Sequence, residues 1–320
     1  MTRAAGLALA ASAALAAVLG GCGIGSGTKG TGAAKLTISR DFGTSVLRRD
    51  SLPKVPENET VMRFLQRRAR VDTRYGGRFV EAIDGLRSVQ PAGRREDWFY
   101  YVNGIEADTG AAERELEPGD SVWWDHHDWT DAMRVPAVVG SFPEPFLHGA
   151  GGKRYPVRID CAADAADPCR ALADRLEQAE IEPSTTALGA SAGKEVLRFL
   201  VGEWDDVRRD AAAQLIEQGP RESGVFARFG PGRNGYQLDL LNRFGEVVRR
   251  LGGGTGGSGS LVAATRYEEQ QPSWVITGTD RAGLDRAVRL VGLRSLRDRF
   301  AVAAAGGPAI PLPLDPGGGR

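Results

Sequence analysis

The stretch GDSVWWDHHDW, residues 119–129, gathers the side chains of this chain that could most readily do chemistry. It holds two of the three histidines and three of the six tryptophans, together with three aspartates. Histidines and carboxylates are metal ligands and general acid–base groups, whereas tryptophan rings stack on flat ligands. The stretch therefore raises three hypotheses: a metal centre, a catalytic centre, or the aromatic end of a β-strand.

The alternation of side chains along a strand distinguishes these hypotheses. The Pro118-Gly119 turn is typical of the entry into a strand, in which successive side chains point to opposite faces. On such a strand His126 shares the face of Trp124, and His127 shares the face of Trp123. The two histidines could then not ligate one metal ion without a bulge. We therefore predict no metal site and no catalytic residue here, and a chain that is not an enzyme.

A second aromatic strand is predicted upstream, in DWFYYVNGIEA, residues 97–107. It ends at Asn103-Gly104, a pair that favours a tight reversal. Trp98 and Tyr100 share one face of it, and Phe99 and Tyr101 share the other. The single helix predicted within residues 57–69 can cover one face of the sheet. The other face would carry large aromatic side chains, and its cover could be a second domain, a ligand or another protein.

The first domain, residues 35–133, runs as a hairpin, a helix and several strands, which fits a β-grasp-like fold with one helix on a mixed sheet. DWFYYVNGIEADTG and LEPGDSVWWDHHDW are similar to a bacterial domain family of unknown function related to the C-terminal β domain of transcobalamin and intrinsic factor. The similarity lies in Trp98, Tyr100, Val102-Asn103-Gly104, Gly110-Ala111 and Gly119-Asp120. In transcobalamin this domain covers a corrin ring held by a separate helical barrel. The resemblance thus implies cobalamin as a ligand.

The candidate ligand-binding residues combine the two aromatic strands with the residues around their turns. They are Trp98, Tyr100, Asn103, Trp123, Trp124, His126, His127 and Trp129.

The N-terminus predicts export and lipidation. Residues 1–21 have a positive start and a short apolar run, as in a secretory signal peptide. Leu19-Gly20-Gly21-Cys22 resembles a bacterial lipobox, which implies cleavage before Cys22 and acylation of its sulfur, including palmitate. Acyl chains contribute about 0.8 kcal/mol per buried methylene. We expect an extracytoplasmic protein anchored in the cell membrane, with residues 22–34 as a flexible Gly/Ser/Thr tether.

The second half predicts an α/β domain over residues 151–305, because segments typical of strands and of helices alternate. A Pro-rich linker with one short strand, residues 134–150, precedes it, and a Pro/Gly-rich tail, residues 306–320, follows. Cys161 and Cys169 form an even pair in an exported protein, which predicts a disulfide bond. The whole chain is therefore expected to be α+β in class.

Composition and motifs narrow the function. The formal net charge is zero, so nothing points to nucleic acid. The Gly-rich stretches 189–196 and 252–260 lack the complete pattern of a phosphate loop. We predict a binding lipoprotein for cobalamin or another flat ligand, working with a small-molecule uptake transporter. The alternative is a structural or protein-interaction lipoprotein whose aromatic face is buried between its domains. A third hypothesis is an exported hydrolase or metalloenzyme using Asp125, His126, His127 and Asp128.

Overall fold

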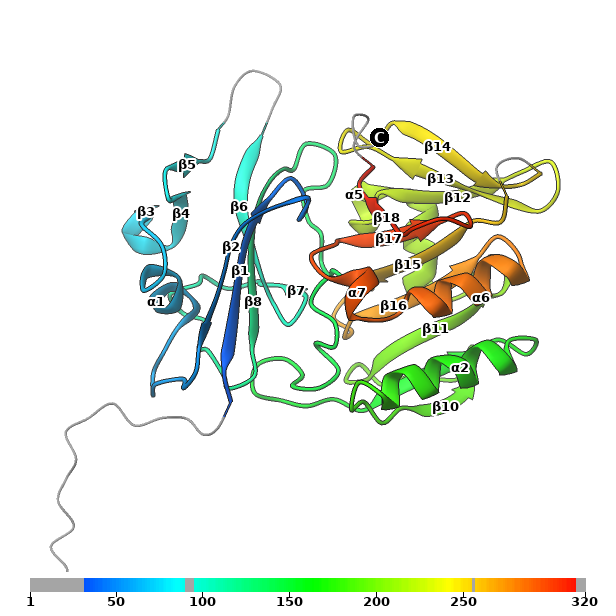
Figure 1. The fold of residues 1–320 in the computed structure, drawn as a ribbon, viewed down its shortest axis with the longest axis horizontal. Helices are drawn as coiled ribbons and strands as arrows, with labels where there is room; N and C mark the ends of the chain where they lie inside the picture. Colours follow the sequence, from blue (N-terminus) through cyan, green and yellow to red (C-terminus); the bar gives the residue numbers. More distant parts are fainter. Residues whose placement is uncertain (1–31, 90–94, 255–256, 315–320) are drawn as a thin grey trace, which may run out of the picture.

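The computed structural model describes residues 32–89, 95–254 and 257–314. The signal peptide, Cys22 and nearly all of the tether lie outside the described residues, as does the end of the tail. The chain is α+β, as predicted, and it is built around two sheets that lie side by side (Figure 1). No helix among the described residues is both long and apolar enough to cross a membrane.

The first half is organised on a five-stranded mixed sheet. Its strands, in spatial order, are β2 (Ser45–Leu52), β1 (Ala34–Arg40), β8 (Ser121–Asp128), β6 (Glu96–Val102) and β7 (Ile105–Glu106). β1 runs parallel to β8, and all other pairs are antiparallel. The reversal between β6 and β7 has positive φ at both Asn103 and Gly104. A Cβ on Gly104 would lie 2.8 Å from the carbonyl oxygen of Val138, so glycine is required there.

One face of this sheet is covered as the sequence predicts, by a helix, but not by the helix alone. The covering elements are α1 (Val61–Gln66), β3 (Val71–Arg74), η1 (Tyr75–Gly77), β4 (Phe79–Ile83) and β5 (Leu86–Arg87). Phe64 and Leu65 of α1 pack in one core with Val80 of β4 and Trp98 of β6. Thr60 caps α1 by accepting a hydrogen bond from the backbone N–H of Arg63. Because α1 has only six residues, the small β3–β4–β5 sheet supplies the rest of the cover.

The second half is organised on a seven-stranded sheet. Its strands, in spatial order, are β10 (Ser184–Ala187), β9 (Val157–Cys161), β11 (Leu197–Glu203), β16 (Ser273–Gly278), β15 (Ser260–Thr265), β17 (Ala301–Ala304) and β18 (Ile310–Leu312). The pairs from β10 to β16 are parallel, and the pairs from β16 to β18 are antiparallel. α2 (Ala166–Glu177) and α6 (Arg281–Leu290) cover one face. Both faces are buried, as the alternation of strands and helices predicts.

The opposite face of this sheet packs against short elements and the first half. The short elements are α3 (Trp204–Val207), α4 (Ala211–Gln214), η2 (Leu215–Gln218), α5 (Pro220–Ser223), and the antiparallel strands β12 (Ala227–Pro231), β13 (Tyr236–Leu241) and β14 (Val247–Gly252). The remaining short helix, α7 (Leu293–Leu296), packs Leu296 into the core beneath α2 and α6. The sequence of residues 205–219, DDVRRDAAAQLIEQG, has a pattern typical of one continuous helix. Instead, the Asp210 carboxylate accepts the N–H of Ala212 and starts a new helix, which interrupts the first.

The segment 134–150 is more than a linker. It contains no strand, only two isolated bridges, from Ala137 to Ile105 and from Ala150 to Lys153. Its side chains are buried on both sides: Val138 packs into the core that joins the two halves, and Val139 and Phe146 pack into the core beneath α2 and α6. Pro143 and Pro145 have no N–H to donate to a ladder, which is consistent with the absence of a strand.

The predicted disulfide bond is present between Cys161 at the end of β9 and Cys169 in α2. We expect the double substitution Cys161→Ser, Cys169→Ser to lower the free energy of unfolding by about 2–3 kcal/mol, because the unfolded chain gains the entropy of the opened loop. Urea denaturation of the wild type with and without dithiothreitol measures this, the double variant being the control that reductant should leave unchanged. Equal stability of all four samples would contradict the expectation.

Candidate functional site

The side chains of β8 alternate as predicted. Trp124 and His126 face the core beneath α1, where Tyr100 stacks on Trp124 at 4.8 Å and Trp98 contacts His126 at 5.1 Å between ring centroids. Trp123 and His127 face the second half, and the His127 ring is 4.5 Å from that of Phe42. The two histidines therefore lie on opposite faces of the strand.

The second half covers the aromatic face that the sequence left without a cover. Tyr101 and Trp123 are 0 % and 2 % exposed. Phe300 inserts edge-on between them, with ring centroids 5.5 Å from Tyr101 and 5.2 Å from Trp123. Arg243 Nη1 lies 2.7 Å from Asp41 Oδ1 across the same junction. Of the three covers considered, the structure therefore has the second domain.

A buried hydrogen-bond network at this junction occupies the polar groups of β8. Asp125 is fully buried and accepts hydrogen bonds from the backbone N–H of Phe42 and of Gly43, at 3.0 and 2.9 Å, and from the hydroxyl of Ser39. His127 Nδ1 lies 2.8 Å from Asp125 Oδ1. Serine, aspartate and histidine are all present, but the aspartate lies in the middle, and no serine–histidine hydrogen bond is formed that would activate a nucleophile.

The remaining predicted residues are also held by the chain itself. The side-chain amide of Asn103, 0 % exposed, donates to Asp120 at 2.9 Å and to the carbonyl oxygen of Gly149 at 2.8 Å. His126 Nε2 lies 3.0 Å from the carbonyl oxygen of Arg87, and burial lowers the pKa of His126. Trp129 Nε1 donates to Asp97 at 2.7 Å. These contacts assign Asn103, His126 and Trp129 to the fold of the first half.

Within the part of the chain that the structure describes, no three or more His, Cys, Asp or Glu side chains are grouped so that they could hold a metal ion. His126 and His127 in particular are separated by the strand itself.

Three hollows meet on the segment from Glu106 to Thr109, which lies beside the junction of the two halves, where β7 ends (Figure 1). We call them together the 106–109 groove. The first, about 490 Å³, is lined by Asp108, Met133, Arg134, Pro136, Arg221, Glu222, Arg266, Glu268 and Glu269. The second, about 240 Å³, shares Asp108 and Arg266 with the first. The third, about 170 Å³, shares Glu106 and Thr109 with the second.

The third hollow is aromatic and contains three of the predicted residues. Trp98, Tyr100 and Trp124 line it together with Phe79 and Phe99. The Tyr100 hydroxyl donates to the carbonyl oxygen of Thr109 at 2.6 Å, and burial raises the pKa of Tyr100 to about 12. The structure thus brings together three of the eight predicted residues at the groove and places the other five elsewhere.

The first hollow is charged and uses residues that the sequence analysis missed. Arg134 Nε lies 3.2 Å from Glu106, and Arg221 Nη2 lies 3.0 Å from Asp131. Burial raises the pKa of Glu106, while Arg134 acts in the opposite direction. The carboxylates of Asp108, Glu222 and Glu269 line this hollow without a side-chain partner among the described residues. These residues come from distant parts of the chain, so no local pattern signals them.

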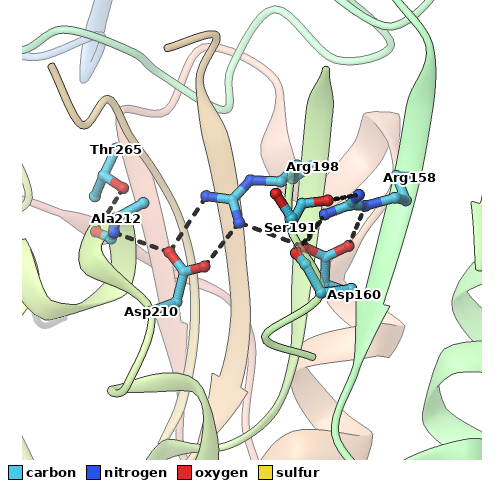
Figure 2. Close-up of polar contacts among 8 residues, drawn as sticks. Arg158, Asp160, Ser191, Arg198, Asp210, Ala212 and Thr265 are labelled. Atoms are coloured by element: carbon cyan, nitrogen blue, oxygen red, sulfur yellow. Dashed lines mark hydrogen bonds and ion pairs between the residues drawn. The ribbon is translucent and has the colours of Figure 1, made fainter. Parts of the chain in front are cut away.

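A separate hollow of about 520 Å³ lies at the carboxyl ends of β9, β10 and β11. Behind it runs a chain of ion pairs: Arg198 bridges Asp160 at 3.3 Å and Asp210 at 2.7 Å, and Thr265 bonds the carbonyl oxygen of Ala212 (Figure 2). Such edges bind ligands in many α/β sheets. Each charged side chain in this row of ion pairs has a partner. The row therefore serves to fix α4 to the sheet.

Comparison with known proteins finds a family model that is similar to part of the first half. Residues 58–128 match the model of a domain of unknown function, DUF4430. This segment includes β6, β7, β8 and the aromatic hollow. A crystal structure from Ruminococcus gnavus ATCC 29149, to which a metal-binding role has been ascribed, is similar at 10% identity with a TM-score of 0.23, covering 30% of this chain and 97% of that one. No curated protein matches the chain.

Proposed function

We propose that this protein is a non-catalytic extracytoplasmic lipoprotein, anchored through Cys22, that binds a small molecule in the 106–109 groove. The observation that carries the proposal is the meeting of three hollows on one segment at the junction of the two halves. Ligand sites occur preferentially at such interfaces and have volumes of about 300–1,000 Å³. The 490 Å³ hollow is within this range, and the 170 Å³ hollow extends it with an aromatic wall.

A corrinoid, delivered to an uptake transporter, is the specific ligand that we propose. A corrinoid is a flat ring system with amide groups around its edge, and amides both donate and accept hydrogen bonds. The groove supplies the complementary groups, with Arg266 as a donor and Asp108 and Glu269 as acceptors. The resemblance to the transcobalamin β domain supports the same ligand. The aromatic face of Trp123 is covered by the second half, so the groove replaces it as the binding surface.

The test is a titration of the purified chain with hydroxocobalamin, followed by absorption spectroscopy and gel filtration. We expect a spectral change and co-elution for the wild type. Arg266→Ala should weaken binding at least about tenfold, as expected for the loss of a charged hydrogen bond. Arg249→Ala, which removes an exposed arginine of β14, is the matched control and should bind as the wild type does. No spectral change together with no co-elution would refute the corrinoid.

The anchor is tested independently of the ligand. Cys22→Ala should move the protein from the membrane fraction to the soluble fraction, because the sulfur that would carry the lipid is gone. A variant that stays in the membrane fraction would contradict the anchor.

A structural or protein-interaction lipoprotein is the second candidate function. It is favoured by the burial of the aromatic face between the two halves, where Phe42, Tyr101, Trp123 and Phe300 form one core. Under this alternative the groove binds no small molecule, and the hydroxocobalamin titration gives no signal.

A further inference from the structure

A hollow of about 290 Å³ lies on the junction of the two halves, away from the 106–109 groove. It is lined by residues of β1, β2 and the start of β8 on one side, and of the 140–144 turn and α7 on the other. Its charged side chains are Lys35, Arg49, Asp50, Glu144, Arg297 and Asp298. None of its lining residues is shared with the groove.

The three carboxylates of this hollow already have partners. Asp298 forms an ion pair with Arg49, Asp50 forms one with Arg68, and Glu144 is hydrogen-bonded to His148 Nδ1. Two cations remain: Lys35 of β1 and Arg297, which follows α7. Both side chains are exposed, and neither has a side-chain partner among the described residues. The two cations without a side-chain partner therefore come from both halves of the chain.

A hydroxyl group in the wall of the hollow also lacks a partner. Ser141 is 9 % exposed, and its Oγ forms no hydrogen bond with any described residue. A buried hydroxyl without a partner costs free energy, and a bound acceptor would recover it. Ser141 lies in the lining with Lys35 and Arg297, and its buried hydroxyl could donate to a ligand in the hollow after rotation about χ1.

We propose that this hollow binds a phosphate group, as a monoester or a diester. A phosphate presents several acceptor oxygens in a tetrahedral arrangement, which suits two separate cations and a hydroxyl better than a planar carboxylate does. The volume accommodates the phosphate with a small substituent such as glycerol. Two sources have this chemistry: the headgroup of a phospholipid and a soluble phosphate ester.

The position of Lys35 in the chain brings the hollow within reach of phospholipid headgroups. Lys35 follows Cys22 by 13 residues, a span of at most about 45 Å when fully extended. If the anchor proposed above exists, it keeps this end of β1 near the bilayer surface. The phosphate site itself depends on neither the anchor nor the corrinoid, and its test uses neither.

The experiment uses the full chain with Cys22→Ala, so that no lipid tethers it. Inorganic phosphate and glycerol 3-phosphate are titrated by calorimetry. In a second arm the protein is sedimented with vesicles of phosphatidylcholine alone or of phosphatidylcholine and phosphatidylglycerol in a ratio of about four to one, where anionic headgroups attract cationic segments. The test variant is Lys35→Ala, Arg297→Ala. The control is Lys54→Ala, Arg294→Ala, which removes the same charges from exposed positions outside the hollow.

We expect binding of at least one probe, weakened at least about tenfold by Lys35→Ala, Arg297→Ala and unchanged in the control. Site-dependent sedimentation with the phosphatidylglycerol vesicles identifies a lipid headgroup as the source. Calorimetric binding without sedimentation identifies a soluble phosphate. No binding of any probe, or an equal loss in both double variants, would overturn the proposal. Because all the substituted side chains are exposed, unchanged circular dichroism is expected throughout.

Discussion

Phe300→Ala is expected to lower the free energy of unfolding by about 3–5 kcal/mol, a large fraction of the roughly 5–15 kcal/mol that stabilises a typical domain. Phe300 is 3 % exposed. Its ring makes edge-on contacts with the rings of Phe42, Tyr101, Trp123 and His127, at centroid distances of 5.2–5.5 Å. Truncation would leave a cavity among four rings that belong to the first half, and it would remove four ring contacts between the halves.

Urea denaturation followed by circular dichroism and by tryptophan fluorescence measures this effect. Phe244→Ala is the matched control, because Phe244 is 41 % exposed and its truncation should change stability by less than about 0.5 kcal/mol. If Phe300→Ala is as stable as Phe244→Ala, the second half does not cover the aromatic face as the structure describes. The outcome bears directly on function, because an uncovered face would return Trp123 to the list of ligand-binding residues.

The sequence predicts well those structural features that depend on residues close together in the chain. Strand alternation placed His126 and His127 on opposite faces of β8, and Asn103-Gly104 marked the turn after β6. The same reasoning could not choose a cover for Trp123, because the ring that contacts it, Phe300, lies far along the chain. Packing between distant segments leaves no periodic signal.

The candidate site likewise has one part that the sequence predicts and another that it does not. Trp98, Tyr100 and Trp124 were predicted because aromatic side chains on one strand face form a visible pattern. The charged part of the groove was missed, since Asp108 and Arg266 are ordinary loop residues in the sequence. Only the docking of the two halves brings them together. The sequence also missed the break at Asp210, where a side-chain cap competes with an otherwise helical pattern.

Asp125→Ala is expected to destabilise the fold by at least about 3 kcal/mol, because it would leave several buried donors without an acceptor. The carboxylate accepts from the N–H groups of Phe42 and Gly43 and from Ser39, and it pairs with His127. Ser39, Asp125 and His127 are 0 %, 0 % and 2 % exposed, so water could not replace the lost acceptor without opening the junction.

The expected loss distinguishes a structural role of Asp125 from a chemical one, and urea denaturation measures it. Asp125→Asn should be intermediate, because the carboxamide retains one acceptor oxygen and presents an amide donor where a second oxygen accepted. Asp285→Ala, at an exposed i, i+4 pair with Arg281 on α6, is the control and should cost no more than about 0.5 kcal/mol.

A residue kept for reactivity can often be replaced without loss of stability, since active sites carry strain rather than relieve it. An Asp125→Ala protein of wild-type stability would therefore revive the hydrolase or metalloenzyme hypothesis for the 119–129 stretch. A protein that is destabilised, with Asp285→Ala unchanged, assigns Asp125 to the junction that buries the aromatic face.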